Sequence, residues 1–228
     1  MLSSVELFGM PGCGKSTVTK LLASQLTEAS NMTFVTRKDI SKNIDRMYKH
    51  PFIVPIIYLY HYLFLSCWLF KKHLRAFAKQ YPLTRHRMIY EVYCIVLYDI
   101  YKKGLQESEL LLLDEGFIQY LSSISHGVDV RTNKSFFVLM QDISAITKET
   151  MFVDCQLDTR TTIQRIKVRG KQDRFGHSED LLMKLNLKQR NIDCIASAIC
   201  PKKRIVLHMQ APSEYNTRII KNLLYEKN

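Results

Sequence analysis

The chain has 228 residues, of which 46% are hydrophobic and 24% are charged. This composition is typical of a globular protein and excludes a chain that is disordered throughout, and the length suits a single large domain. The formal net charge of +12 at pH 7 points to an anionic partner, such as a nucleotide, a phosphorylated metabolite, a nucleic acid or a membrane surface, or else to a solvated basic surface.

The cysteines and the N-terminus bear on the cellular compartment. The six cysteines form no C-x-x-C pair, and no histidine spacing completes a zinc pattern. Free thiols in a reducing cytosol are therefore expected. The N-terminus has no basic segment ahead of its apolar run, so we expect no secretory signal and a cytoplasmic protein.

The first predicted elements are a β-strand at residues 5–8 and a helix at residues 17–29. The helix has one apolar face, because its large apolar residues recur every fourth position from Val18 to Leu26. Between the two elements runs G-M-P-G-C-G-K-S (residues 9–16), which fits G-x-x-x-x-G-K-[ST] at every fixed position. This context predicts a phosphate-binding loop, and the alternative is a glycine-rich turn that only resembles one.

The residue types in this loop explain the pattern. Glycines allow successive backbone N–H groups to turn toward one anion, and the positive end of the helix dipole points at the same place. Lys15 adds a point charge for the outer phosphates, and the hydroxyl of Ser16 is placed to bind Mg²⁺. The predicted nucleotide-binding residues are Gly9, Met10, Pro11, Gly12, Cys13, Gly14, Lys15, Ser16 and Thr17.

A second strand is predicted at residues 31–37, and an insertion follows at residues 38–109. Within the insertion, residues 51–70 carry no formal charge and are as long as a membrane span. Pro51 and Pro55 dilute this apolar run, so we favour a buried helix pair in an acceptor-binding subdomain. The alternatives are a membrane span and a peripheral membrane contact through residues 51–70.

A third strand is predicted at residues 110–114, where four leucines lead into Asp114. A continuous apolar run is typical of a buried parallel strand, so Asp114 is expected at the carboxyl edge of the sheet, near the phosphate loop. There it would hold the Mg²⁺ shell or accept a proton from an acceptor hydroxyl, and Glu115 is a candidate for either role. The alternative role of Asp114 is to cap a helix from Phe117 onward.

The remainder of the chain alternates between helices and strands. Two short helices are predicted within residues 117–148, further strands at 151–157 and 205–208, and further helices after Asp158, from Ser178 and at 213–225. This alternation predicts a parallel sheet with right-handed crossovers in one domain that spans residues 1–228. The insertion at residues 38–109 would interrupt that domain between the second and third strands.

Two groups of cations lie near predicted loops. Arg165, Arg169, Lys171 and Arg174 bracket a short loop, and a mobile lid there would bring one or two of them over the transferring phosphoryl group. The alternative is a solvated charge run. The predicted acceptor-binding residues are Arg37, Asp39 and Arg87.

Several of these segments resemble the thymidylate kinase-like family of P-loop nucleoside and nucleotide kinases. The phosphate loop and its helix match, and Thr36-Arg37 is similar to the family's Thr-Arg-Glu-Pro segment. The run R-G-K-Q-D-R-F, which begins at Arg169, resembles the family's lid, and Gln210 to Glu214 resembles its adenine-side loop. The resemblance implies a three-layer α/β/α fold with a five-stranded parallel sheet, a lid loop at residues 169–177, ATP as donor, and Mg²⁺.

The chain departs from this family where an acceptor would bind. Asp114-Glu115-Gly116 stands where the family has Asp-Arg or Glu-Arg, so a usual phosphate-orienting arginine is missing. Lys38-Asp39 replaces Glu-Pro, and residues 40–109 match nothing specific. Substrate identity therefore does not transfer with the family resemblance.

The resulting hypothesis is an ATP- and Mg²⁺-dependent kinase with a nucleoside or nucleoside monophosphate as acceptor. Its expected catalytic residues are Lys15, Asp114, Arg169 and Arg174, and its expected metal ligands are Ser16 and Asp114. Alternative acceptors are a sugar or a lipid-linked group at a membrane. Alternatives of another class are a nucleotide-binding switch, a nucleic-acid-associated NTPase, and a degenerate kinase that recruits a partner. Nucleic acid is not the favoured partner, and a homodimer is left open.

Overall fold

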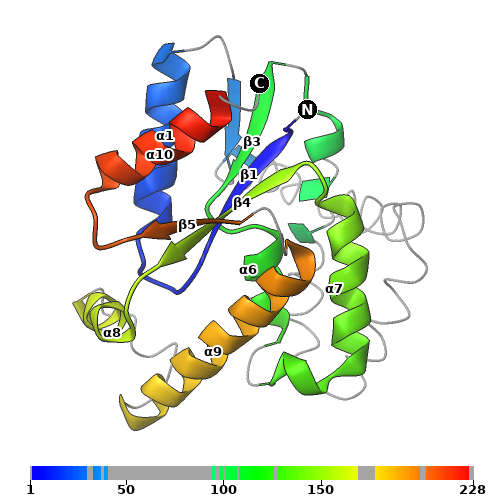
Figure 1. Ribbon diagram of the computed structural model, residues 1–228, viewed down its shortest axis with the longest axis vertical. Helices are drawn as coiled ribbons and strands as arrows, with labels where there is room; N and C mark the ends of the chain where they lie inside the picture. The colour runs from blue at the N-terminus through cyan, green and yellow to red at the C-terminus, as the bar shows by residue number, and fades with distance from the viewer. Residues whose placement is uncertain are drawn as a thin grey trace, which may run out of the picture.

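Five parallel strands form one sheet in the order β2-β3-β1-β4-β5 (Figure 1). The strands are β1 (Ser4–Phe8), β2 (Thr33–Thr36), β3 (Glu109–Leu113), β4 (Thr150–Gln156) and β5 (Arg204–His208). The computed structural model describes residues 2–29, 33–36, 39–40, 94–95, 98–99, 101–106, 108–125, 128–168, 178–200 and 204–225. Strands β3 and β4 follow each other in the chain but pair with opposite sides of β1. The end of β1 therefore lies where the strand order reverses, which is the usual ligand site of such sheets.

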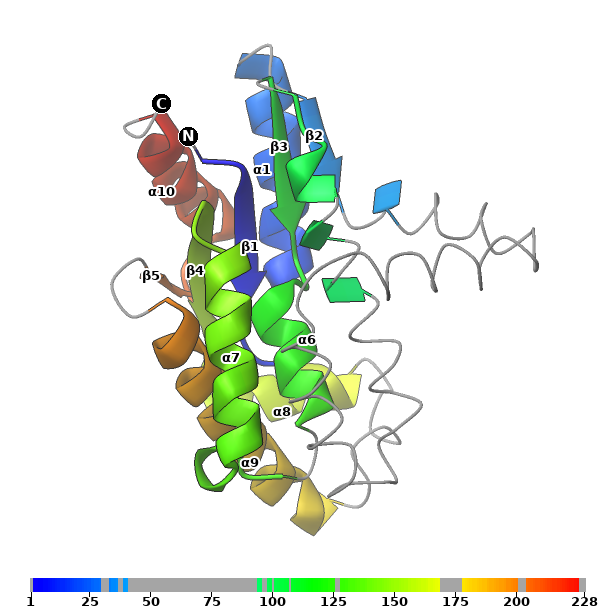
Figure 2. The same ribbon diagram turned by 90° about the vertical axis from the view of Figure 1, so that its right-hand side faces the viewer.

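Helices cover both faces of the sheet. They are α1 (Lys15–Ala29), α6 (Phe117–Ile124), α7 (Lys134–Ile146), α8 (Thr159–Val168), α9 (Ser178–Ile199) and α10 (Ser213–Tyr225), with a 3₁₀ turn, η2, at Val130–Thr132. Helices α1 and α10 pack together on one face, and α6, α7 and α9 pack on the other (Figures 1 and 2). The predicted three-layer α/β/α fold with a five-stranded parallel sheet is thus confirmed.

The insertion lies where the sequence placed it, between the second and third strands. Strand β2 ends at Thr36 and β3 begins at Glu109, and the described residues between them at 39–40, 94–95, 98–99 and 101–103 are helical. Residues 51–70, for which a buried helix pair or a membrane contact was predicted, lie outside the described residues. Within the described ranges, no helix has the length and apolar character needed to cross a membrane.

The side-chain pattern of the strands explains how the two cores form. In β1, Val5 and Leu7 join the core under α1 and α10, whereas Phe8 joins the core under α6, α7 and α9. The leucines of β3 alternate between the same two cores, Leu110 and Leu112 on one face and their neighbours on the other. Because both faces of β3 are covered, apolar residues occupy its successive positions 110–113 instead of alternating with polar ones.

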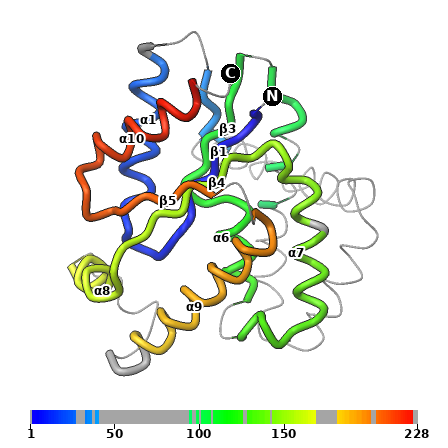
Figure 3. Tube along the Cα trace, in the orientation of Figure 1, coloured from blue at the N-terminus to red at the C-terminus, as the bar shows by residue number. Residues whose placement is uncertain are grey.

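The parallel register brings three loops to one edge of the sheet. Thr36 at the end of β2 pairs with Leu112 of β3, and Leu113 pairs with Glu6 of β1. The segments that leave β1, β2 and β3 therefore emerge at the same carboxyl edge. Helix α8 approaches the β1–α1 loop at this edge, as the chain trace shows (Figure 3).

A buried asparagine ties α9 to the segment before α7. Asn191 is 2% exposed, its Oδ1 accepts from the backbone N–H of Val130 at 3.2 Å, and its Nδ2 donates to the carbonyl oxygen of Val128 at 2.6 Å and to Ser125 Oγ at 3.3 Å. Asn191→Ala would leave these backbone groups buried without partners. We expect the free energy of unfolding to fall by about 2–3 kcal/mol.

Thermal unfolding measures this effect with Asn186→Ala as the matched control, because Asn186 is exposed on the same helix. Asn191→Ala should lower Tm by several degrees, on the order of 5–10 °C for a domain of this size, and Asn186→Ala by about 1 °C or less. Equal Tm values for the two variants would show that the buried hydrogen bonds of Asn191 do not stabilise the fold.

Candidate active site

The loop between β1 and α1 is built around glycines with positive φ angles. Gly9, Gly12 and Gly14 have φ values of 140°, 82° and 108°. Gly9 also lies against β4, where an added Cβ atom would come within 2.5 Å of the backbone oxygen of Cys155. Helix α1 begins at Lys15, so its positive dipole end faces the loop. The conformation is therefore suited to an anion, as the motif predicts.

Lys15 is folded over this loop. Its Nζ donates hydrogen bonds to the carbonyl oxygens of Gly9 and Met10, at 3.0 Å each, and to Sγ of Cys13 at 3.6 Å. The side chain is only 8% exposed. The loop thus holds an ammonium group inside its own curve, where a phosphate that enters the loop would meet it.

Two thiols beside Lys15 have pKa values shifted in opposite directions. A hydrogen bond with Cys155 is the largest cause that lowers the pKa of Cys13 to about 6, against the effect of burial and with help from the charge of Lys15. The same hydrogen bond, followed by burial, raises the pKa of Cys155. All described cysteines are free thiols.

Ser16 and Asp114 meet at the carboxyl edge although they are 98 residues apart in the chain. The Ser16 hydroxyl donates to Oδ2 of Asp114 at 2.5 Å, and Asp114 directly follows β3. Hydroxyl and carboxylate oxygens are the ligands that Mg²⁺ accepts, and it usually takes one or two carboxylates together with substrate phosphates and water. The described ranges contain no group of three or more His, Cys, Asp or Glu that could hold a metal unaided. The donor set therefore fits a Mg²⁺ ion that arrives with nucleotide phosphates.

A cavity of about 400 Å³ adjoins the loop on the side of α8 and α10. It is lined by Cys13, Gly14, Thr17, Arg165, Met209, Gln210, Ala211, Pro212 and Ser213. Arg165 of α8 borders it, and its Nη1 donates to the carbonyl oxygens of Gly12 at 3.4 Å and of Cys13 at 3.3 Å. The volume and the mixed lining suit part of a nucleotide.

Helix α10 holds the outer wall of this cavity in place. The Asn216 side chain is 1% exposed, and its Nδ2 donates to the carbonyl oxygens of His208 and Ala211 at 3.4 Å each. Gln210 Nε2 also donates to Oδ2 of Asp158 at 3.3 Å, which joins this wall to the start of α8. The segment that resembled an adenine-side loop is thus fixed on both sides.

The other predicted site residues divide into one that is described and four that are not. Asp39 lies just after β2, where its Oδ2 accepts from the backbone N–H and the hydroxyl of Thr36 at 3.0 and 2.6 Å. It therefore shapes the exit from the strand at the same sheet edge as Asp114. The predicted residues outside the described ranges are Arg37, Arg87, Arg169 and Arg174, with the rest of the lid loop at 169–177.

Sequence reasoning missed the group that caps α6. The alternative role of Asp114 as a helix cap is wrong, because the N-cap residue of α6 is Gly116, which has no side chain to donate or accept. A carboxylate oxygen of Glu6 on β1 accepts from the N–H of Ile118 instead, at 2.8 Å. The only signal for this cap in the sequence was Glu6 itself, an acidic residue in the strand that precedes the phosphate loop. Arg165 was predicted as a lid cation, not as a contact of the phosphate loop.

Comparison with known proteins supports the fold. No protein-family model matches the chain, and no curated protein matches it. It is similar to a structure of deoxyadenosine kinase from M. mycoides with the products dCMP and a flexible dCDP bound, with 14% identity, a TM-score of 0.53, and coverage of 99% of this chain and 100% of that one. The same enzyme with bound dATP gives 14% identity, a TM-score of 0.54, and coverage of 98% and 99%. At this identity the likeness shows a shared fold.

Proposed function

We propose that the protein is a P-loop kinase that transfers the γ-phosphate of ATP to a nucleoside or nucleoside monophosphate. The observation that carries this proposal is the contact between Ser16 and Asp114, together with the Lys15 ammonium held in the adjoining phosphate loop. These are the groups that phosphoryl transfer requires, since it depends on holding phosphates, placing a metal and neutralising charge. A glycine-rich turn that binds no ligand would not need a lysine, a hydroxyl and a carboxylate at the same place.

The chain's own residues have distinct roles in this proposal. The loop amides and Lys15 bind and orient the β- and γ-phosphates, and the cavity beside Arg165 receives the base and sugar of ATP. Ser16 and Asp114 would hold Mg²⁺, which would supply positive charge against the phosphates. Asp114 or Glu115 accepts the proton of the attacking hydroxyl. Arg169 and Arg174 act as cations of the lid loop at residues 169–177.

The acceptor class is proposed from the structural neighbours together with the sequence resemblance. The neighbours are deoxyadenosine kinase structures that hold dATP, or dCMP and dCDP. The thymidylate kinase-like segments point to a related acceptor, a nucleoside monophosphate. Both acceptor types would enter between the Asp114 edge and the insertion at residues 38–109, which is where this chain differs most from the resembled family.

The test is ADP formation from Mg·ATP against a panel of acceptors. The panel holds deoxynucleosides, nucleoside monophosphates, simple sugars and a nucleic-acid sample, with Lys15→Ala protein as the blank. We expect one class of nucleoside or nucleoside monophosphate to stimulate ADP formation in the wild type and not in the blank. A flat panel, with only slow Lys15-dependent hydrolysis, would contradict a kinase for these acceptors and favour a nucleotide-binding switch.

A further inference from the structure

Strand β1 carries a carboxyl group into the protein interior. Glu6 is fully buried at the centre of the sheet. The register sets it between Leu113 of β3 and Phe152 of β4, both of which are buried. A carboxyl group in such a place raises the free energy of the folded state unless the fold supplies hydrogen-bond partners.

The partners come from the first turn of α6. Oε1 of Glu6 accepts from the backbone N–H of Ile118 at 2.8 Å and from that of Gln119 at 3.4 Å. These are the second and third residues of the helix, whose N–H groups a side chain at the N-cap normally satisfies. The N-cap of α6 is Gly116 and makes no side-chain cap. Glu6 therefore caps α6 from strand β1, and it lies 112 residues before Ile118 in the chain.

The same contact accounts for the glycine in Asp114-Glu115-Gly116. A Cβ atom on Gly116 would lie 2.6 Å from both Cδ and Oε2 of Glu6 and 2.9 Å from its Cγ. The φ angle of Gly116 is −130°, which any residue adopts, so the backbone conformation does not require glycine. The space taken by the Glu6 carboxyl group requires it.

The turn that Glu6 holds carries the candidate metal ligand. Asp114 lies two positions before Gly116, and its carboxylate accepts from the Ser16 hydroxyl. The turn is fixed at one end by the pairing of Leu113 in the sheet and at the other by Glu6. A shift of the Gly116 end would therefore rotate or displace the Asp114 carboxylate.

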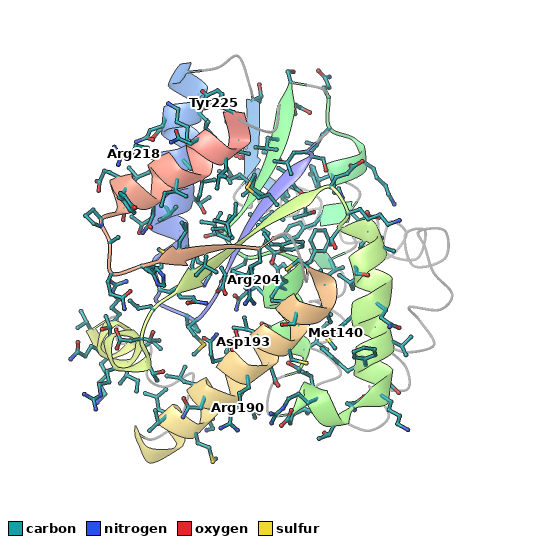
Figure 4. All side chains as sticks on the ribbon, in the orientation of Figure 1. Met140, Arg190, Asp193, Arg204, Arg218 and Tyr225 are labelled. Atoms are coloured by element: carbon teal, nitrogen blue, oxygen red, sulfur yellow. The ribbon has the colours of Figure 1, made fainter. Side chains whose placement is uncertain are left out.

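The surroundings of Glu6 favour its neutral form. Burial raises its pKa from 4.5 to about 8, although the backbone N–H groups at the start of α6 act in the opposite direction. On the same face, β4 contributes Asp154, which pairs with Arg204 at 3.7 Å. Arg204 lies on β5, where Figure 4 labels it. The end of α9 contributes Cys200, whose pKa burial raises to about 12. Helix α6 has no charged residue, and β3 presents leucines.

We propose that Glu6 is a positioning residue: its carboxyl group caps α6, fixes the turn at Asp114–Gly116 and so sets the Asp114 carboxylate against Ser16. This inference rests on the proposed function, which gives Asp114 its role. Glu6 does not line the cavity beside Arg165. It acts only through the turn.

Two substitutions separate positioning from general stability. Glu6→Gln keeps an oxygen that accepts from α6 and adds no charge, so at pH 7 its kcat should stay within about twofold of the wild type. Glu6→Ala removes the cap, so kcat per folded molecule should fall at least about tenfold while KM for ATP changes less than about twofold. The proposal would be overturned if the Glu6→Ala protein had the kcat of the wild type at a temperature where the variant is folded.

The pH profile provides a second readout. Because the folded-state pKa of Glu6 is raised, the folded protein keeps a proton that the unfolded chain loses, and stability decreases as the pH rises from 4.5 to about 8. Glu6→Gln has no proton to lose. Its Tm should therefore exceed that of the wild type by a margin that grows across this window. Wild-type turnover should fall above about pH 8, where Glu6 loses its proton, and the turnover of Glu6→Gln should not fall for this reason. Parallel profiles would contradict a neutral Glu6.

A double-mutant cycle tests the contact with Gly116 directly. Gly116→Ala alone should lower both Tm and kcat, because the new methyl group meets the Glu6 carboxyl group. In the Glu6→Ala background that obstacle is absent, so adding Gly116→Ala should cause little further loss of either. Additive losses in Tm and kcat would show that Glu6 and Gly116 act independently and would overturn the proposal.

Failure of this inference can be told from failure of the proposed function. If no acceptor supports turnover, the function fails, but binding of a fluorescent ATP analogue with and without Mg²⁺ still reports on Asp114. Glu6→Ala should reduce the gain in affinity that Mg²⁺ gives by at least about fivefold and leave metal-free binding within about twofold. An unchanged Mg²⁺ effect would refute positioning by Glu6 whether or not an acceptor is found.

Discussion

Lys15→Ala is expected to lower turnover by about 10³-fold, the largest effect of any single substitution in this site. The Lys15 ammonium is held inside the loop by the carbonyl oxygens of Gly9 and Met10 and by Cys13. A charge placed in advance stabilises the transferring phosphoryl group without reorganisation at the moment of reaction. Steady-state kinetics with the best acceptor of the panel measures the loss.

Lys20→Ala is the matched control for this prediction, because Lys20 lies on the same helix and is exposed. We expect its kcat to stay within about twofold of the wild type. Thermal unfolding should show that Lys15→Ala protein is folded, since the loss is one of charge and not of core packing. A Lys15→Ala protein that is folded and keeps more than about a tenth of wild-type turnover would refute the role given to the phosphate loop.

The second large effect is expected at the end of β3. Asp114→Ala should lower kcat by about 10²-fold and should raise the Mg²⁺ concentration needed for half-maximal activity. The reason is the contact of its carboxylate with Ser16, which brings together the two oxygens that would hold Mg²⁺. Titration of Mg²⁺ at saturating ATP measures both quantities.

Glu115→Ala separates the two neighbouring carboxylates. If Asp114 serves the metal and Glu115 the acceptor, Glu115→Ala should lower kcat without changing the Mg²⁺ requirement. If Glu115 has neither role, its replacement should leave kcat within about twofold. Less than a tenfold loss from both Asp114→Ala and Glu115→Ala would show that this strand end does not carry the chemistry.

The features that could be predicted from the sequence are those that depend on a few consecutive residues. The phosphate loop is one run of eight residues, and its glycines are required by local φ angles at Gly9, Gly12 and Gly14. The leucines at 110–113 predict a buried parallel strand because both faces of such a strand are covered. Asp114 could be placed at the carboxyl edge for the same reason, since every parallel strand ends on the same side.

The sequence predicted the boundaries and lengths of the elements less well. The second strand, predicted at residues 31–37, is Thr33–Thr36, and the second of two short helices predicted before β4 is α7, with 13 residues. Propensity and periodicity set such boundaries only loosely, because packing against neighbouring elements decides where pairing stops. The lid and most of the insertion lie outside the described residues, so Arg37, Arg87, Arg169 and Arg174 stay predictions.

The sequence by itself determined that the chain carries a phosphate loop on an alternating α/β framework, because each of those features depends on neighbours a few residues apart. Only the tertiary structure decided that Glu6 caps α6, that Gly116 makes room for it, and that Arg165 contacts the phosphate loop. Those contacts join residues more than a hundred positions apart. No local pattern encodes them, since the partner of a buried polar group is chosen by which strands and helices the fold sets side by side.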